Sequence, residues 1–472
     1  MNTRSHCAGA VLVILSLAGC ALAAEGPHLN VLLLLVDDLG WADLGCYGAD
    51  LHETPNIDRL AARGVRFTDA YAAASVCTPT RAALLTGKAP ARLNMTVWRE
   101  ASRNPPEGRP VVPPVTEENL PLEEVTLAER FRAAGYATAI VGKWHLGGAE
   151  YYPENQGFDI NIGGTCWGAP QTFFWPYRGN KRYGGEPRYV PGLHDGKPGE
   201  YLTDQLTDEA ISILREWATR PFFLQMSYYT VHTPMEAPAE DVEYYQSKLA
   251  DGMPHSNPIY AAMVGRLDKS VGRLLGELDR LDIAKTTIVV LTSDNGGYVN
   301  EYEGTRVTNN APLRSGKGSL WEGGIRVPLL IYRPEIDQAV CHEPVVTNDL
   351  YRTLLAMTGV DGGESGIDGM DISLLLDNPG ARLGRDALYW HYPHYYPTTT
   401  PVGAIRRGDW KLLEFFEDGR LELYNLDRDP GESANLAEQE PRIAANLYRM
   451  LREWRDEVGA RMPVVNEGGN RE

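Results

Sequence analysis

The feature that most constrains the fold of this chain is an alternation of short apolar runs with longer stretches of helical periodicity. Five apolar runs are typical of buried strands: Asn30–Val36, Ala137–Val141, Phe222–Tyr228, Thr287–Thr292 and Val327–Tyr332. Four stretches have the period of an amphipathic helix: Ile57–Arg63, Leu127–Ala134, Asp204–Ala218 and Tyr260–Leu281. This alternation predicts an α/β fold in which helices cover both faces of a mostly parallel, mixed sheet. Ligands of such sheets bind beyond the carboxyl ends of the strands.

The C-terminal part of the chain predicts a smaller unit of a different kind. Residues 361–383 are rich in Gly and Asp and form a plausible boundary. Beyond it, Gly403–Leu413 and Arg420–Leu426 resemble antiparallel strands joined by a turn at Asp418-Gly419, and a helix follows at about Pro441–Val458. We therefore expect a main domain over residues 25–378 and an α+β subdomain over 379–472. Two stretches, 100–120 and 150–200, resemble irregular loops.

The first 24 residues resemble a signal for export. Arg4 supplies a positive charge, and the apolar run Ala8–Ala18 is too short to span a bilayer comfortably. Leu17-Ala18-Gly19-Cys20 resembles a lipobox, in which Cys20 would carry a lipid. The small residues from Ala21 to Ala24 offer an ordinary cleavage site instead. Either alternative predicts a protein that is periplasmic, secreted or anchored by lipid at the cell surface.

Charge and cysteine content exclude some classes of function. The formal net charge of the 472-residue chain is −18, which argues against a nucleic-acid partner. A site for an anion must then be a local cationic pocket in an acidic body. Outside the signal, the cysteines are Cys46, Cys77, Cys166 and Cys341. At most one bridge is possible if Cys77 is modified, so no dense disulfide framework is expected.

Two predicted strands end in oxygen-bearing side chains. Asp37 and Asp38 follow the first strand, and Asp294 and Asn295 follow the fourth. Adjacent carboxylates repel each other unless a cation lies between them, and oxygen-rich sites suit Ca²⁺ or Mg²⁺. Each pair alone could be an exposed loop, but the two together predict a divalent metal site.

Cys77 lies at the start of a predicted helix. Thr78 could cap this helix and Pro79 suits its first turn, so Cys77 would lie at the positive end of the helix beside Arg81. Backbone N–H groups and a guanidinium there would favour an anion. The alternative is an ordinary buried cysteine.

Other cationic and imidazole side chains follow further predicted strands. Lys143 and His145 are two residues apart at a strand end and could face the same pocket. His232 follows the third strand, and Lys317 lies in a loop flanked by glycines. Taken singly, such residues are more often structural histidines or surface lysines.

Together these segments resemble the formylglycine-dependent sulfatases, which belong to the alkaline-phosphatase-like superfamily. Cys77-Thr78-Pro79-Thr80-Arg81 resembles their Cys-x-Pro-x-Arg signature, with Thr80 where many members have serine, and Gly135–Gly147 resembles their second signature. The resemblance extends from Asn30 to about Glu432. It implies that a maturation enzyme, of the formylglycine-generating or the anaerobic type, oxidises Cys77 to formylglycine, whose hydrate is the nucleophile.

The resemblance also implies a role for each site residue. Asp37, Asp38, Asp294 and Asn295 would hold one Ca²⁺ per chain, which also binds the group derived from Cys77. Arg81, Lys143 and Lys317 would stabilise charge on the sulfuryl oxygens, and Asp294 would take the proton of the nucleophile. His232 would protonate the leaving alcohol, and His145 would accept the proton that is released when sulfate departs.

The substrate is less constrained by the sequence. The aromatic stretches Trp167–Tyr177 and Trp390–Tyr396 could stack on sugar rings or pack a core, and His391 and His394 are candidate substrate contacts. We expect a sulfatase that acts on a sulfated carbohydrate, such as a fragment of a glycosaminoglycan or an algal polysaccharide. The alternatives are a phosphoester or phosphonate hydrolase of the same superfamily and an inactive carbohydrate-binding lipoprotein.

Overall fold

The main sheet has eight strands, and β1 lies in its centre. The computed structural model describes residues 29–363 and 366–466, so the expected signal and Cys20 lie outside the described residues. The strand order is β12-β2-β11-β8-β1-β7-β5-β6. The strands are β1 (Asn30–Val36), β2 (Val65–Phe67), β5 (Ala137–Gly142), β6 (Ile160–Ile162), β7 (Phe222–Ser227), β8 (Thr287–Ser293), β11 (Leu329–Tyr332) and β12 (Ala339–Cys341). All pairs from β8 to β6 are parallel, whereas β11 runs antiparallel to β8 and β2. The predicted mixed, mostly parallel sheet is confirmed.

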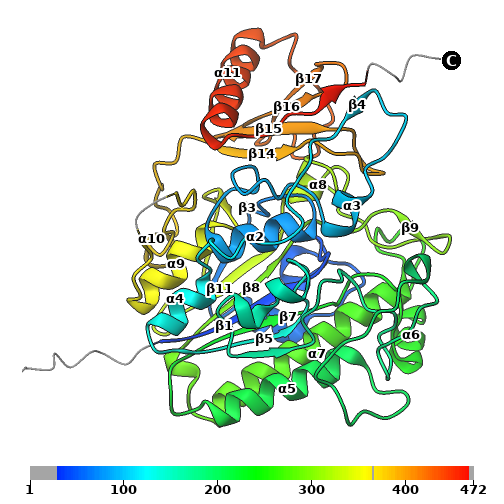
Figure 1. The fold of residues 1–472 in the computed structure, drawn as a ribbon, viewed down its shortest axis with the longest axis vertical. Coiled ribbons are helices and arrows are strands. Elements are labelled where there is room, and N and C mark those ends of the chain that lie inside the picture. Colours follow the sequence, from blue (N-terminus) through cyan, green and yellow to red (C-terminus); the bar gives the residue numbers. More distant parts are fainter. Residues whose placement is uncertain (1–28, 364–365, 467–472) are drawn as a thin grey trace, which may run out of the picture.

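Helices cover both faces of this sheet (Figure 1). In β1, Leu32 and Leu34 face one hydrophobic core while Leu33 and Leu35 face the other, and all four are fully buried. A strand that is apolar on both faces needs cover on both. One side carries α1 (Pro55–Ala61), α5 (Leu202–Glu216) and α7 (Pro258–Arg280), and the other carries α2 (Cys77–Thr86), α4 (Leu127–Ala133) and α9 (Asp349–Thr358).

A second, antiparallel sheet lies with α11 (Pro441–Val458) at one end of the molecule (Figure 1). Its strands are β14 (Leu388–Tyr392), β15 (Val402–Arg407), β16 (Trp410–Phe415) and β17 (Leu421–Asn425). The prediction of one strand over Gly403–Leu413 was wrong, because the chain reverses at Gly408, whose φ of 56° suits glycine. The predicted turn at Asp418-Gly419 does join β16 to β17. The domain boundary after residue 378 stays a prediction.

This small sheet packs against segments that carry the site. Trp390 and Val402 share a hydrophobic cluster with Val76 and Leu320, which are neighbours in sequence of Cys77 and Lys317. The indole N–H of Trp390 also donates to the carbonyl of Ala72, at 2.9 Å. The second sheet therefore braces the loops around the site from behind.

The remaining elements are short. They are β3 (Ala70–Tyr71), α3 (Arg99–Arg103), β4 (Val111–Val112), α6 (Ala239–Gln246), β9 (Glu301–Tyr302), β10 (Thr305–Arg306), α8 (Glu322–Ile325), β13 (Val345–Val346), α10 (Leu374–Asp377) and β18 (Val464–Val465). The stretch expected to be a loop over 100–120 thus begins within helix α3. Cys46, Cys77, Cys166 and Cys341 are all free thiols. No helix in the described ranges is long and apolar enough to cross a membrane.

Candidate active site

The two oxygen-bearing strand ends meet at the centre of the sheet. β1 and β8 are parallel neighbours, with Val36 paired to Ser293, so the residues after them lie side by side. The backbone N–H of Asp38 donates to Asp294 Oδ1 at 3.2 Å, and Asn295 Nδ2 donates to Asp38 Oδ1 at 2.8 Å. The side chains are at most 1% exposed. The predicted cluster therefore exists, and it is buried.

The cluster fits a hard divalent cation. One ligand atom from each of Asp37, Asp38, Asp294 and Cys77 lies within 4.8 Å of the others. Asn295 Oδ1 is buried and has no hydrogen-bond partner. Burial, with the neighbouring carboxylates, raises the pKa of Asp37 to about 8. Carboxylates that cannot ionise readily together, beside an unpartnered amide oxygen, are the donors that Ca²⁺ prefers.

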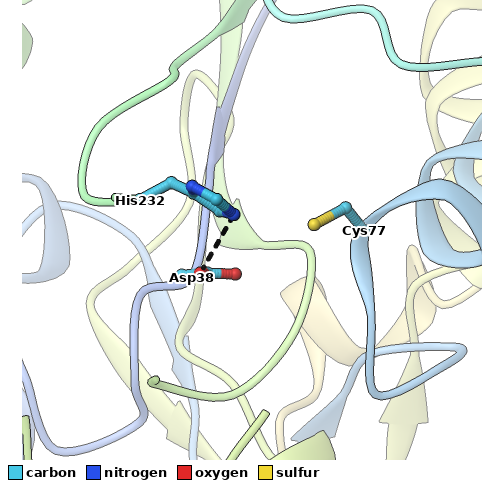
Figure 2. Close-up of side chains that lie close together, drawn as sticks. All are labelled: Asp38, Cys77 and His232. Atoms are coloured by element: carbon cyan, nitrogen blue, oxygen red, sulfur yellow. Dashed lines mark ion pairs between the residues drawn. The ribbon is translucent and has the colours of Figure 1, made fainter. Parts of the chain in front are cut away.

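Cys77 is the first residue of α2, which begins two residues earlier than expected. The N-cap is Val76 rather than Thr78, whose hydroxyl instead donates to the carbonyl of His145 at 2.9 Å. The sulfur of Cys77 lies 3.5 Å from Asp37 Oδ1 and 3.5 Å from Lys317 Nζ. Figure 2 shows it pointing toward His232 and Asp38. Burial raises the pKa of the thiol to about 12, so the unmodified residue is not a thiolate nucleophile.

Arg81, one turn into α2, fixes the carboxylate of Asp294. Its Nε and Nη2 both lie 2.8 Å from Asp294 Oδ2, and its Nη1 donates to Ser227 Oγ at 2.7 Å. The guanidinium is 2% exposed. Arg81 therefore supplies a buried positive charge and orients one oxygen ligand.

Lys143 and His145 diverge, because β5 ends at Gly142 and the alternation of a strand does not reach them. Lys143 Nζ donates to both oxygens of Asp37, at 2.9 and 2.7 Å. His145 has a left-handed φ of 62°, and its Nε2 lies 2.7 Å from a carboxylate oxygen of Glu100. Burial lowers the pKa of His145 to about 4, although Glu100 opposes this shift. The neutral ring thus carries its proton toward Glu100 and leaves Nδ1, which is buried and unpartnered, as a proton acceptor.

Lys317 and His232 flank the other side of Asp38. Lys317 Nζ lies 2.7 Å from Asp38 Oδ1, and its loop is tight because a Cβ on Gly316 would lie 2.4 Å from the carbonyl of Gly297. His232 Nε2 lies 3.6 Å from Asp38 Oδ2 (Figure 2). Burial and the Lys317 charge lower the pKa of His232 to about 3. A proton added to this ring would be readily given up.

A cavity of about 260 Å³ opens above these residues. Of the predicted catalytic and metal-binding residues, Asp38, Cys77, His145, His232 and Lys317 line it. The others, Asp37, Arg81, Lys143, Asp294 and Asn295, are buried. Further side chains that the sequence interpretation did not single out also line it, among them Trp98, Glu100, Tyr183, Arg188 and Tyr298. Tyr396, from the second aromatic stretch, lines it as well. The first five belong to segments without strand or helix periodicity, so only their residue types could have pointed to them.

His391 and His394 do not line this cavity. His391 Nε2 lies 2.9 Å from the carbonyl of Arg461, and His394 Nε2 lies 2.8 Å from the hydroxyl of Thr96. Both are 6% exposed. Of the first aromatic stretch, Phe173 and Tyr177 are fully buried in the core. The placement gives neither histidine a substrate contact, so we do not assign them one.

Comparisons with known proteins agree on one family. Residues 29–360 match the family described as sulfatase, and residues 316–457 match the C-terminal region of N-sulphoglucosamine sulphohydrolase. Arylsulfatase A of Homo sapiens is 33% identical, over 90% of this chain and 86% of the human protein. N-acetylgalactosamine-6-sulfatase of Sus scrofa is 36% identical, over 92% of this chain and 80% of the relative. The crystal structure of Ps i-CgsB with k-i-k-neocarrahexaose is 29% identical with a TM-score of 0.75, covering 90% of this chain and 92% of that one.

Proposed function

This chain belongs to the sulfatase family and is a sulfuric ester hydrolase, and we propose that it removes sulfate from a sulfated carbohydrate after Cys77 is oxidised to formylglycine. The observation that carries the proposal is the position of Cys77. It lies at the floor of the cavity, between the oxygen ligands and Lys317. The hydrated aldehyde would supply the nucleophilic hydroxyl. Asp37, Asp38, Asp294 and Asn295 would hold a Ca²⁺ that supplies positive charge to the site.

The cationic side chains bind the sulfate group. Lys317 Nζ lies 3.5 Å from the Cys77 sulfur, so it can contact a sulfuryl oxygen brought next to that position. Arg81 and Lys143 lie beneath, where each neutralises a carboxylate. Fixed cations in a site closed to water stabilise the charge that develops on the sulfuryl oxygens.

Two imidazoles move protons on opposite sides of the cavity. His232 is placed to protonate the leaving alcohol oxygen. Burial and Lys317 keep its ring neutral in the free site, and the negative charge of a bound sulfate ester favours the protonated ring that acts as the acid. Nδ1 of His145 accepts the proton released when sulfate departs, while Glu100 holds the ring by Nε2. Asp294, ionised beside Arg81, accepts the proton of the attacking hydroxyl.

The cavity walls favour a sugar as the alcohol part. Trp98, Tyr183, Tyr298 and Tyr396 offer aromatic faces, and Arg188 and Glu100 offer polar groups. Sugar rings present apolar faces and hydroxyl edges that suit this mixture. Several relatives are named for sulfated sugars, and one similar structure holds an oligosaccharide. Export to a compartment that contains polysaccharides is consistent with the expected signal.

The test is a desulfation screen across defined sulfated saccharides, with enzyme shown by mass spectrometry to carry formylglycine. We expect sulfate release from at least one saccharide, with kcat/KM well above that for the matched phosphate ester. Cys77→Ala should abolish turnover. Cys77→Ser should keep the sulfuryl group, because serine has no second hydroxyl whose proton could be removed to expel it. Equal or greater rates on phosphate esters, or full turnover by Cys77→Ala, would contradict the proposal.

A further inference from the structure

A second buried cluster of metal-ligating side chains lies behind the catalytic site. Asp43 follows β1 in the loop that carries Asp38, His52 precedes α1, and His255 precedes α7. One ligand atom from each of the three lies within 4.8 Å of the others. The side chains of His52, His255 and Asp43 are 1%, 4% and 0% exposed. The sulfate chemistry uses none of them.

One nitrogen of this cluster is buried without a hydrogen bond, although it faces the carboxylate of Asp43. His255 Nδ1 is hydrogen-bonded to Asp50, so Nε2 points inward, where it is buried without a hydrogen bond and 3.4 Å from Asp43 Oδ1. A charge-assisted N–H···O bond is shorter, at about 2.7–2.9 Å. In contrast, two ligands bound at ~2.0–2.1 Å to one tetrahedral metal ion are ~3.3–3.4 Å apart. The distance of 3.4 Å between His255 Nε2 and Asp43 Oδ1 therefore fits two ligands of one metal ion better than a direct hydrogen bond.

His52 is the third side chain of the cluster. Its Nδ1 lies 3.7 Å from the same oxygen of Asp43 and 3.0 Å from the Asp43 backbone carbonyl. Burial lowers the pKa of His52 to about 4, so the ring is neutral and has one lone pair. In this structure Nδ1 carries the proton that it donates to this carbonyl. With a metal bound, the proton would lie on Nε2, and the Nδ1 lone pair and the carbonyl oxygen would join the carboxylate and His255. The donors are then two nitrogens and two oxygens.

Each ligand is also held by an outer group, as metal ligands usually are. Asp43 Oδ1 accepts from Thr308 Oγ1 at 2.6 Å. Asp43 Oδ2 accepts from the Gly40 N–H at 2.7 Å and from the Tyr260 hydroxyl at 2.6 Å. Asp50 orients His255 in the carboxylate–histidine pattern of zinc sites.

We propose that Asp43, His52 and His255 bind a structural divalent transition metal, with zinc the best match to imidazole and carboxylate ligands. The site would stiffen the catalytic loop from behind. Asp43 caps the turn at Gly40, and the hydroxyl of Tyr260 lies 3.5 Å from the carbonyl of Asp38.

The experiment measures metal content in tag-free protein produced with added zinc and dialysed against metal-free buffer. Wild type should keep stoichiometric zinc besides calcium. The His52→Gln/His255→Gln double variant should lose the zinc and keep the calcium, whereas His194→Gln, at an exposed histidine, should keep both. Cobalt-substituted wild type should absorb visible light with a tetrahedral pattern that the double variant lacks.

A milder variant guards against misfolding of the double variant. Asp50→Asn keeps every ligand and should weaken zinc affinity by ~10–100-fold, measured by competition with a chelator. Zinc content in wild type no higher than in the double variant would overturn the proposal, and would mean that a proton bridges His255 and Asp43. An unchanged zinc affinity in Asp50→Asn would also count against it.

Discussion

At the scale of single residues, Glu100 decides which nitrogen of His145 can act. A neutral imidazole has one N–H and one lone pair, and the nearest acceptor fixes which nitrogen carries the proton. Glu100 lies 2.7 Å from Nε2. Burial raises its own pKa, but the contacts with His145, with the backbone and with Arg188 together outweigh burial and hold it below the usual range. Glu100 therefore acts through His145 as a positioning residue.

Replacing Glu100 by Gln tests this role. We expect kcat to fall about 10- to 100-fold with little change in KM, because the imidazole loses its fixed orientation while the sulfate contacts remain. The acid limb of the kcat profile should move to lower pH, because the carboxylate that favours protonated His145 is gone. Glu100→Asp should restore part of kcat. Glu118→Gln, which removes a carboxylate paired with Arg103, serves as the control. A change in KM alone would contradict the positioning role.

The sequence was sufficient to predict the residues whose chemistry depends on a motif. Asp37, Asp294, Cys77 and Lys317 were expected in one site, and the structure does bring them together. Glu100 could not be predicted, because its role depends on where an irregular segment folds back. The substrate guess at His394 rested on residue type alone, and burial beside Thr96 leaves it no open face.

At the scale of elements, a buried charge network joins the small sheet to the main domain. Lys411 on β16 lies 2.8 Å from Glu322, at the start of α8, and 2.9 Å from Glu432. Tyr71 on β3 donates to the second oxygen of Glu322 at 2.7 Å. Two carboxylates share one ammonium here, so burial, together with Glu322, raises the pKa of Glu432 to about 7.

This shared ammonium predicts a pH dependence of stability. The folded state holds the Glu432 proton more tightly than the unfolded state, whose pKa is near 4.5. The stabilising contribution is complete below pH 4.5 and is lost as the pH rises through 7. Glu432→Gln should remove this loss, which amounts to up to about 3 kcal/mol. Urea unfolding at pH 5 and pH 8 measures it, with the exposed Glu438→Gln as control. An equal pH dependence in wild type and Glu432→Gln would contradict the assignment.

Two glycines with opposite surroundings test how the end of β8 shapes the site. A Cβ on Gly296, the residue after Asn295, would lie 1.9 Å from the carbonyl of Gly323, whereas one on Gly276 in α7 meets nothing within 4 Å. Gly296→Ala should therefore displace Asn295 and lower both calcium affinity and melting temperature. Gly276→Ala should stabilise the protein by roughly 0.5–1 kcal/mol through helix propensity. Calcium titration and thermal unfolding compare them, and normal calcium binding by Gly296→Ala would refute the packing argument.

Periodicity predicted the long elements well and the short ones poorly. β1 was predicted with its observed bounds, and α4 to within one residue, because each repeats one pattern long enough to be recognised. The hairpin of β15 and β16 was merged into one strand, because Gly408 and Asp409 interrupt the apolar pattern only briefly. α3, with five residues, is shorter than the window that such reasoning needs.

At the scale of the whole molecule, an anion site lies in a body of net charge −18. Around Cys77, the cations Arg81, Lys143 and Lys317 are matched by the carboxylates of Asp37, Asp38 and Asp294. Both imidazoles are neutral, so once a bound cation ionises Asp37 these side chains carry no net charge by themselves. With the proposed divalent cation bound, the attraction for a sulfate ester would come from that cation and would act over a short range.

This balance predicts an unusual salt effect. From ~10 to ~150 mM salt the screening length falls from about 30 to about 8 Å. This screens the long-range repulsion between the acidic protein and the anionic substrate, but it leaves the short-range contacts between the sulfate group and the cavity largely unchanged. We expect kcat/KM for a monosulfated sugar to rise over this range while kcat stays constant. Steady-state kinetics in a sodium chloride series measures it. A fall in kcat/KM would mean that the inner cations govern the approach.

The position of β1 in the sheet also determines when the site can form during synthesis of the chain. β1 pairs with β7 and β8, which are synthesised much later, and 213 residues separate Arg81 from its partner Asp294. At ~5–20 residues per second, that stretch takes roughly 10–40 s to make. Until β8 and Asp294 have been synthesised, the site around the start of α2 cannot form. Cys77 therefore stays accessible to an oxidising enzyme during this time. Once the sheet is assembled the same residue is 3% exposed. The proposed oxidation of Cys77 would therefore compete with folding, and the order of strands in the sheet would give the oxidation the earlier start.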